Sequence, residues 1–410
     1  MLECSATSEI AMKNVIYSLL AMAGLLTSAT TAEAYEATPG YVVYEGNMFA
    51  PGESGPEFKK TLNDKYGTQF IFDLVYGYWA LDNAMPGYNH NANMAILYTI
   101  LNQRLIKDEL NGGTWLRVDF AGSWGLDRDT ARAATFYANS IGMCSGLHTD
   151  VFEGHDAALL EISAKHFFAR KRGCITAGMI KLNNYFDRID HARFTNDNFE
   201  SSGVLPLPYN NLAVVGQYEL DGRNWVTGAV TRMGTRWGHN PFDPDQANGY
   251  AIVTEWGRLF DDGKGKTRLS PFFCSQDAEG RNGRNHHHNA VGIFGSVEYQ
   301  VNTPLKVYAR AGWASGDYLR CTAEASVGAT IKLIPSRPGD YLGIGCGLFK
   351  GGESPTSELV NEFEKIVEVM YRYEINDYLY TSVYYQMIMD AAYRDKNFAS
   401  ATGLQVGLCF

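Results

Sequence analysis

An alternation of apolar and polar residues with a period of two recurs along most of this 410-residue chain and restricts its fold more than any other feature. Short segments rich in Tyr, Val, Ile, Phe and Trp are separated by clusters of Gly, Asn, Asp and Pro, which is the pattern of β-strands and turns. In the segment 365–375, for example, Val367 and Val369 flank Glu368. One face of such a strand is apolar and the other is charged, so the two faces meet different environments.

The lengths of the connections between these segments also alternate. The pattern predicts about sixteen strands, at 69–79, 92–102, 114–124, 158–170, 174–183, 211–220, 224–235, 249–260, 265–275, 290–301, 305–315, 321–334, 340–349, 364–375, 378–389 and 400–410. Short connections follow the even-numbered strands, and longer ones, among them 125–157, 184–210, 236–248, 276–289, 350–363 and 390–399, follow most odd-numbered strands. Two unlike rims are typical of a transmembrane up-and-down antiparallel β-barrel, so the predicted fold class is all-β.

Composition excludes several other classes of protein. The formal net charge is -10 and no block of Lys or Arg occurs, so nucleic acid is not an expected partner. The mean hydropathy of -0.22 argues against a helical membrane protein. The chain has seven Cys but no CxxC pair and no Cys/His spacing of a zinc site, and we expect no cofactor. The run His286–His288 suits either a metal site or a solvated rim loop, and its Asn- and Gly-rich surroundings favour the loop.

The N-terminus has the pattern of a secretory signal peptide. A basic start at Met12–Asn14 precedes an apolar run from Val15 to Leu26, and Ala32–Ala34 provides an A-x-A cleavage site. A membrane anchor is disfavoured because the apolar run spans only about 18 Å as a helix, against a hydrocarbon core of about 30 Å. We expect residues 1–34 to be a signal peptide with an upstream extension, with Met12 the better initiator. Residues 35–68 are then a periplasmic N-terminal segment and 69–410 the barrel.

The last strand is the sharpest local signal. Thr402, Leu404, Val406 and Leu408 alternate with smaller or polar residues, and the chain stops at the aromatic Phe410. An apolar alternating strand that ends on an aromatic residue is how outer-membrane barrels finish, so Phe410 is the predicted signal for the barrel-assembly machinery.

Tryptophan positions favour a bilayer environment. Trp124 and Trp313 end strands at the long-loop rim, and Trp225 begins one at the short-turn rim, as expected of aromatic girdles. Trp115 lies off the outward face of its strand. The alternative is that these residues fill a core.

Several stretches resemble the carbohydrate-selective porins of Gram-negative outer membranes, the OprB type, from about residue 40 to the end. They are Ala177–Leu182 leading into Phe186, Phe194–Phe199, the strand Leu212–Leu220 with its Asp221–Gly222 turn, Glu364–Tyr373, and Gln386–Phe410. The resemblance implies a sixteen-stranded pore through which sugars diffuse, narrowed by inward-folded loops. It implies no enzymatic activity, with outer-membrane lipid and sugars as partners and a homo-oligomer as a possibility.

A channel of this kind needs polar groups that replace the water a sugar sheds. Strand parity places charged side chains of both signs in the lumen: Arg117, Asp119, Glu161, Lys165, Glu255, Glu298, Arg310, Glu324, Lys332, Glu368, Arg372 and Glu374. Any water-filled barrel is lined in this way, so the alternative for each residue is that it only lines the lumen and makes no selective contact with sugar. As pore-lining contacts to sugar the chain offers Arg117, Asp119, Glu298, Arg310, Glu368 and Arg372. As constriction residues in the two longest loops it offers Arg128, Arg132, Arg188 and Arg193.

The favoured function is therefore a passive outer-membrane porin for mono- or small oligosaccharides. An outer-membrane barrel enzyme or adhesin that works through its long loops is the alternative, and a secreted soluble carbohydrate-binding protein or hydrolase is a third. Turn geometry sets Cys321 opposite about residue 354, so no disulfide with Cys346 is predicted.

Overall fold

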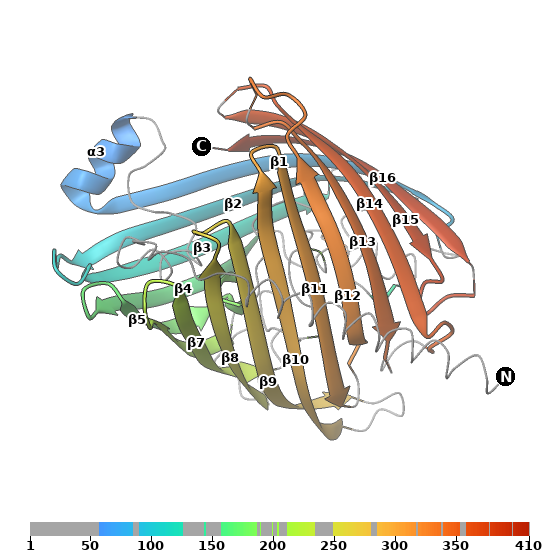
Figure 1. Ribbon diagram of the computed structural model, residues 1–410, viewed down its shortest axis with the longest axis horizontal. Coiled ribbons are helices and arrows are strands. Elements are labelled where there is room, and N and C mark those ends of the chain that lie inside the picture. The colour runs from blue at the N-terminus through green and yellow to red at the C-terminus, as the bar shows by residue number, and fades with distance from the viewer. Residues whose placement is uncertain are drawn as a thin grey trace.

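Each strand pairs with the next in antiparallel order, and β16 returns to pair with β1, so the sheet closes into a barrel in the computed structural model (Figure 1). The strands are β1 Thr68–Asp82, β2 Asn91–Ile106, β3 Thr114–Gly125, β4 Ala157–Phe168, β5 Gly173–Ile180, β6 Asn211–Glu219, β7 Asn224–Met233, β8 Gly249–Phe260, β9 Gly265–Glu279, β10 Asn285–Asn302, β11 Leu305–Gly316, β12 Cys321–Ile331, β13 Tyr341–Gly351, β14 Phe363–Glu374, β15 Leu379–Met389 and β16 Phe398–Cys409. The structure describes residues 57–84, 90–125, 143–144, 157–186, 189, 199, 203–204, 211–233, 249–279, 285–316, 319–337, 339–352, 358–376, 378–395 and 397–409.

The sixteen predicted strands are confirmed, with ends that differ by a few residues. The largest difference is in the hairpin of β9 and β10, whose strands continue into the expected connection 276–289, to Glu279 and from Asn285. His286–His288 belong to β10, where His287 pairs with Asp277 of β9. The prediction of a rim loop at the three histidines is therefore wrong, because the hairpin continues the ladder through polar residues. Among the described residues no group of His, Cys, Asp and Glu is arranged to hold a metal ion.

The barrel closes along a continuous register between its first and last strands. Asp73 pairs with Cys409 at one end of this seam and Asp82 with Ser400 at the other. The alternating sequence of β16 thus joins the ladder that β1 presents. Phe410 itself lies outside the described residues.

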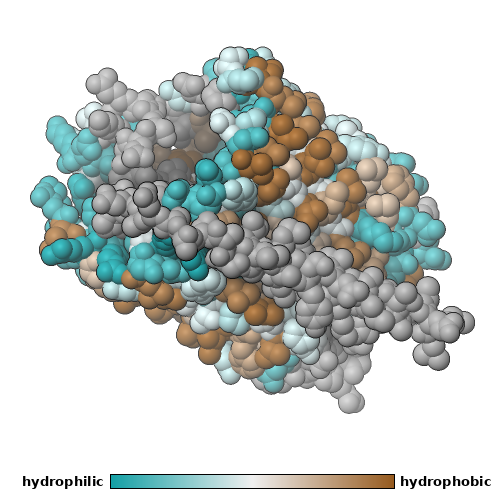
Figure 2. Space-filling model, viewed as in Figure 1, coloured by the Kyte–Doolittle hydropathy of each residue, from teal (hydrophilic) through white to brown (hydrophobic). Residues whose placement is uncertain are grey.

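The outer surface of the barrel is apolar in its middle and polar at its ends. Outward positions of successive strands carry exposed large side chains, among them Leu74 and Tyr76 of β1 and Leu404 and Val406 of β16. Figure 2 shows this face, with hydrophobic residues between hydrophilic ends. Among the described residues, no helix combines the length and apolar character needed to span a membrane.

The tryptophans fulfil the girdle prediction only in part. Trp124 is 38% exposed and Trp313 is 49% exposed on the outer face near the long-loop rim. Trp225 is only 4% exposed, so its assignment to a girdle is wrong. It contacts Leu259 and lies beneath the Arg268 guanidinium, 5.9 Å from the ring centroid. The half-buried Trp115 packs on Phe167, consistent with its position off the outward face.

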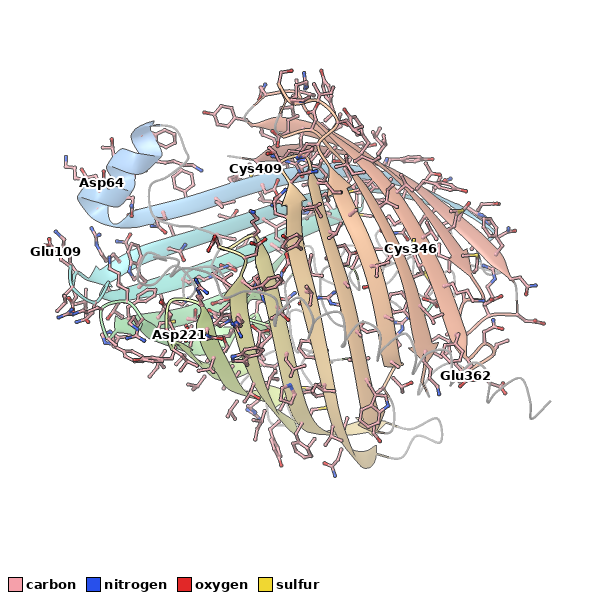
Figure 3. All side chains as sticks on the ribbon, in the orientation of Figure 1. Asp64, Glu109, Asp221, Cys346, Glu362 and Cys409 are labelled. Atoms are coloured by element: carbon pink, nitrogen blue, oxygen red, sulfur yellow. The ribbon has the colours of Figure 1, made fainter. Side chains whose placement is uncertain are left out.

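The short turns lie at one rim of the barrel, and hydrogen bonds from side chains within each turn stabilise them. In the β2–β3 turn, Asp108 accepts hydrogen bonds from the Asn111 side chain at 2.9 Å and from its backbone N–H at 3.0 Å. These bonds lower the pKa of Asp108 and so favour its ionised form. Figure 3 shows Glu109 and Asp221 at this rim and Glu362 at the opposite one.

A helix, α3 (Glu57–Tyr66), precedes the barrel beside the short-turn rim (Figure 1). Phe58 packs against Phe70 of β1 with ring centroids 6.2 Å apart, and Lys59 Nζ donates to the Phe70 carbonyl at 3.2 Å. The expected signal peptide (1–34) and the residues 35–56 of the predicted periplasmic segment lie outside the described residues.

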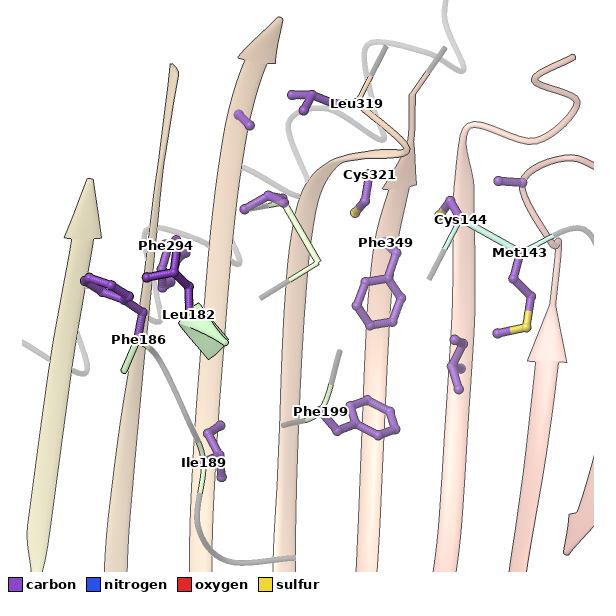
Figure 4. Packing of buried hydrophobic residues seen from close by; sticks show 14 of the residues in the cluster. Met143, Cys144, Leu182, Phe186, Ile189, Phe199, Phe294, Leu319, Cys321 and Phe349 are labelled. Atoms are coloured by element: carbon purple, nitrogen blue, oxygen red, sulfur yellow. The ribbon is translucent and has the colours of Figure 1, made fainter. Parts of the chain in front are cut away.

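The main apolar cluster lies inside the barrel. Its members come from inward positions of the strands and from connections at the long-loop rim, including Met143, Phe186, Phe199 and Phe349 (Figure 4). Packing of a connection against an inner wall excludes water from that part of the lumen. In the wall itself, Cys321 pairs with Gly351, while Cys346 pairs with Val327. These two cysteines therefore lie at different levels, as predicted.

The apolar outer band predicts a depth-dependent cost for charge. Val383 is 50% exposed near the middle of β15, so Val383→Arg should lower the free energy of unfolding by about 2–4 kcal/mol in lipid bilayers. Urea titration of the protein folded into vesicles measures this value, with Val383→Leu as the control. An Arg variant as stable as the Leu variant would contradict a lipid-facing position.

Candidate functional site

The inner wall of the barrel carries the charged residues that the sequence pattern placed there. Nine of the twelve predicted inward residues are buried: Arg117, Asp119, Glu161, Lys165, Glu255, Glu298, Arg310, Glu324 and Glu368. Arg372 and Glu374 are half-buried on β14, and Lys332 lies just past the end of β12. Strand parity thus identified the wall correctly.

A cluster of charges on β3 and β4 forms the first part of the site. Arg117 Nη2 donates to Asp119 Oδ2 at 2.6 Å, and Arg117 Nε lies 3.7 Å from Glu161 Oε2. Ser163 Oγ donates to Glu161 Oε1 at 2.6 Å. Because opposite charges are neighbours, this part of the wall has little net charge.

The same cluster holds the start of the connection between β5 and β6. Tyr185 donates its hydroxyl to Glu161 Oε1 at 3.2 Å, and Asn184 Nδ2 donates to Glu161 Oε2 at 3.4 Å. Lys165 Nζ lies 5.2 Å from the centroid of the Tyr185 ring, a cation–π geometry. The connection therefore leaves β5 along the inner face of the neighbouring strands.

Farther along, the same connection contacts the opposite side of the barrel. Gly203 donates its backbone N–H to Glu324 Oε2 of β12 at 2.7 Å. The Phe199 ring packs on Phe349 of β13 with centroids 6.5 Å apart. In the closed order of sixteen strands, β13 lies opposite β5, and β12 is its neighbour. The connection is therefore bound to two opposite walls.

The connection between β3 and β4 is also bound to the far wall of the barrel. Arg320, just before β12, donates to the Met143 carbonyl through Nε at 3.1 Å and Nη2 at 2.6 Å. Cys144 donates its backbone N–H to Glu364 Oε2 of β14 at 2.8 Å. Glu364 also accepts from the Ala392 N–H at 3.2 Å. In the strand order, β12 is opposite β4, so this connection also links opposite walls.

The other predicted wall residues have local partners. Glu298 Oε1 is 3.4 Å from Lys266 Nζ of β9, and Glu368 accepts from Gln386 Nε2 at 2.6 Å. Arg372 lies over the Tyr380 ring, 3.6 Å from its centroid, and pairs with Glu374 at 3.6 Å. Arg310 is 1% exposed on β11.

Aromatic rings lie flat on the inner wall over glycines of neighbouring strands. A Cβ atom at Gly403 of β16 would overlap the Trp79 ring of β1, and one at Gly257 would overlap Trp225. Trp79 also packs on Tyr384, with centroids 5.4 Å apart, and Tyr384 donates to Gln405 Oε1 at 3.0 Å. The absent side chains at glycine let these rings lie against the wall rather than project into the lumen.

Four predicted constriction residues, Arg128, Arg132, Arg188 and Arg193, lie outside the described residues. The structure adds functional residues that the sequence analysis did not single out. Arg320 and Glu364 anchor a connection, and Gln386 and Lys266 pair with wall carboxylates. Parity could have placed Lys266 and Gln386 inward. Nothing local in the sequence could have indicated the role of Glu364, whose partner Cys144 is 220 positions away.

Comparison with known proteins shows that the chain is similar to outer-membrane porins and channels. Residues 256–410 match the model of the carbohydrate-selective porin, OprB family. A high-pH structure of Pseudomonas putida OprB superposes with a TM-score of 0.67 at 13% identity, over 92% of this chain and 100% of that chain. OmpT of Vibrio cholerae superposes with a TM-score of 0.54 at 10% identity. The outer-membrane channel DcaP of Acinetobacter baumannii superposes with a TM-score of 0.53 at 10% identity. Each match covers 84% of this chain and 97% of the other chain. No curated protein matches the chain in sequence.

The bond between Tyr185 and Glu161 predicts a measurable loss of stability. Tyr185→Phe removes one hydrogen bond to a buried carboxylate and should lower the free energy of unfolding by about 1.5–3 kcal/mol. Urea titration in detergent micelles measures the change. Tyr76→Phe, on the outer face of β1, is the control. If Tyr185→Phe and Tyr76→Phe both have the same free energy of unfolding as the wild type, the bond between Tyr185 and Glu161 does not hold the connection in place.

A side chain added at Gly403, which lies beneath the Trp79 ring, should narrow the lumen. Gly403→Val should displace the Trp79 ring from the wall and lower the single-channel conductance, with a loss of about 1–3 kcal/mol in stability from overpacking. Gly216→Val is the control, because a Cβ there meets no atom within 4 Å. Planar-bilayer recording measures the conductance, and an unchanged value would show that the ring does not border the open path.

Proposed function

We propose that the chain is an outer-membrane β-barrel porin related to the OprB family and that its lumen passes small neutral sugars by passive diffusion. The match of residues 256–410 to the carbohydrate-selective porins supports a channel rather than an enzyme. The observation that carries the sugar proposal is the way the lumen is divided. Two connections are held to opposite walls by hydrogen bonds to Glu324 and to Arg320 and Glu364. Such cross-lumen segments narrow the path that is open to a solute.

The charges of the wall support a neutral polar solute. Arg117 is paired with Asp119, Lys266 with Glu298, and Arg372 with Glu374, so positive and negative groups alternate over short distances. Paired charges give no strong field of one sign, which an ion-selective pore requires. Carboxylates can accept and guanidinium groups can donate hydrogen bonds to sugar hydroxyls as the sugar sheds water.

The selective contacts of this proposal are the six wall residues Arg117, Asp119, Glu298, Arg310, Glu368 and Arg372. The narrowest part is assigned to the loop residues Arg128, Arg132, Arg188 and Arg193. Assembly would use the C-terminal strand with Phe410, and outer-membrane lipid would cover the apolar band. Association of several barrels is part of the proposal, supported by a trimer form of Vibrio cholerae OmpT, which shares this fold at 10% identity.

Sugar permeability is tested by liposome swelling. Vesicles that contain the protein should swell in isotonic monosaccharide, more slowly in disaccharide and more slowly again in trisaccharide, because the lumen is divided by the two connections. Vesicles with heat-denatured protein are the control. Intact barrels at high protein content that admit no monosaccharide would overturn the proposal.

The loop arginines are tested in the same preparation. Arg→Ala changes at 128, 132, 188 and 193 should raise the single-channel conductance and weaken the block of ion current by sugar. Arg170→Ala in the exposed β4–β5 turn is the matched control and should change neither value. Unchanged conductance and block in all four variants would remove these residues from the constriction while leaving the swelling result to decide the function.

A further inference from the structure

We propose that Cys144 and Cys321 form a disulfide that ties the β3–β4 connection covalently to the opposite wall of the barrel. Cys144 lies in that connection and Cys321 is the first residue of β12. The two side chains belong to one buried cluster and are 4% and 2% exposed. Figure 4 shows both within this cluster, together with Met143 and Leu319.

The residues that flank the two cysteines are already bonded to each other. The side chain of Arg320, next to Cys321, donates two hydrogen bonds to the carbonyl of Met143, which is next to Cys144. The N–H of Cys144 is fixed on Glu364, and the backbone carbonyl of Arg320 accepts from the Tyr393 hydroxyl at 3.0 Å. The Arg320 side chain therefore holds together two segments 177 positions apart in sequence, directly before the cysteine pair, and Glu364 and Tyr393 fix each segment separately. A cross-link between cysteines in such a fixed setting needs little backbone movement.

The two thiols also interact directly. The hydrogen bond between the side chains of Cys144 and Cys321, burial, and the nearby Glu364 carboxylate together raise the pKa of Cys144 well above its ordinary value. A buried protonated thiol is a poor nucleophile, so exchange with a reagent is slow once the barrel is folded. We place bond formation in the periplasm as the barrel folds, when the contacts of Arg320 bring the cysteines together and the oxidant still reaches them.

The other described cysteines are placed differently. Cys174 donates to Gln217 Oε1 at 3.4 Å, Cys274 is buried on β9, and Cys346 faces outward in the middle of the wall (Figure 3). Cys409 lies at the end of β16. Within the described part of the chain, the pair on the β3–β4 connection and β12 is thus the one that joins a connection to the wall.

The reaction is a thiol–disulfide exchange with a periplasmic protein disulfide as the oxidant. The two S–H bonds of the cysteines and the S–S bond of the oxidant break, and one S–S bond and two S–H bonds form. The cysteine pair loses two electrons, and the oxidant gains these electrons and both protons. Protein disulfides persist in the periplasm and at the cell surface, where this barrel folds and works.

Mass spectrometry of the wild-type protein tests the cross-link. Cells are lysed in N-ethylmaleimide so that free thiols are trapped, and the barrel is purified from outer membranes, denatured and digested without reductant. We expect a joined peptide pair that contains Cys144 and Cys321 and is two hydrogen atoms lighter than the sum of its parts. Reductant should release two more thiols per chain. Recovery of both cysteines as maleimide adducts would overturn the proposal.

Alanine variants provide a second, independent measurement. Cys144→Ala, Cys321→Ala and the double variant should show the same fall in urea midpoint, because loss of either thiol removes the whole bond. Cys274→Ala is the control for the loss of a buried cysteine elsewhere. Additive effects of the two single changes would indicate packing without a bond and would overturn the proposal. Neither experiment uses sugar, so its failure is distinguishable from a failure of the permeation proposal.

Discussion

The closure of the sheet between β1 and β16 is the constraint on which the rest of this structure depends. Backbone N–H and C=O groups find no water in a bilayer, so an open strand edge would leave a row of them unsatisfied. The register from Asp73–Cys409 to Asp82–Ser400 removes that edge. Once the ring is closed, each strand must turn one face to lipid and the other to the lumen, because successive side chains point to opposite sides. The apolar outer band and the charged inner wall both follow from this single requirement.

Closure also explains how the interior is filled. A ring of this size encloses more space than inward side chains occupy when the Trp79 and Trp225 rings lie flat over glycines. The remaining space is crossed by connections, and a connection brings its own backbone groups with it. Gly203 and Cys144 donate their N–H groups to Glu324 and Glu364, so wall carboxylates satisfy part of the segments that cross the lumen.

Much of this could be predicted from the sequence because the strand signal is local. Alternation in single segments predicted sixteen strands, and parity placed Glu161, Glu324 and Glu368 inside. The girdle assignment of Trp225, made from its place at the start of a strand, failed where both faces of a strand have similar composition. In β7, the inward Trp225, Thr227 and Ala229 alternate with Val226, Gly228 and Val230, so no contrast indicates which face is inside. Contacts between the connections and the wall could not be predicted, since Cys144 and Glu364 are 220 positions apart and neither position carries a local pattern. The loop arginines stay predictions, because they lie outside the described residues.

The double use of the wall carboxylates connects permeation to architecture. Glu161 pairs with Arg117 on the wall and also accepts from Tyr185 of a crossing segment. A carboxylate in this position does two things at once: it contributes charge to the lumen, and it fixes the segment that narrows it. An apolar residue of the same size would leave the Tyr185 hydroxyl without its acceptor, and a neutral amide would weaken the pairing with Arg117. The shape of the lumen is therefore not a property of side chains added to a finished tube. Buried wall carboxylates hold the interior segments in place, so a change in the charge of Glu161 or Glu324 is also a change in lumen shape.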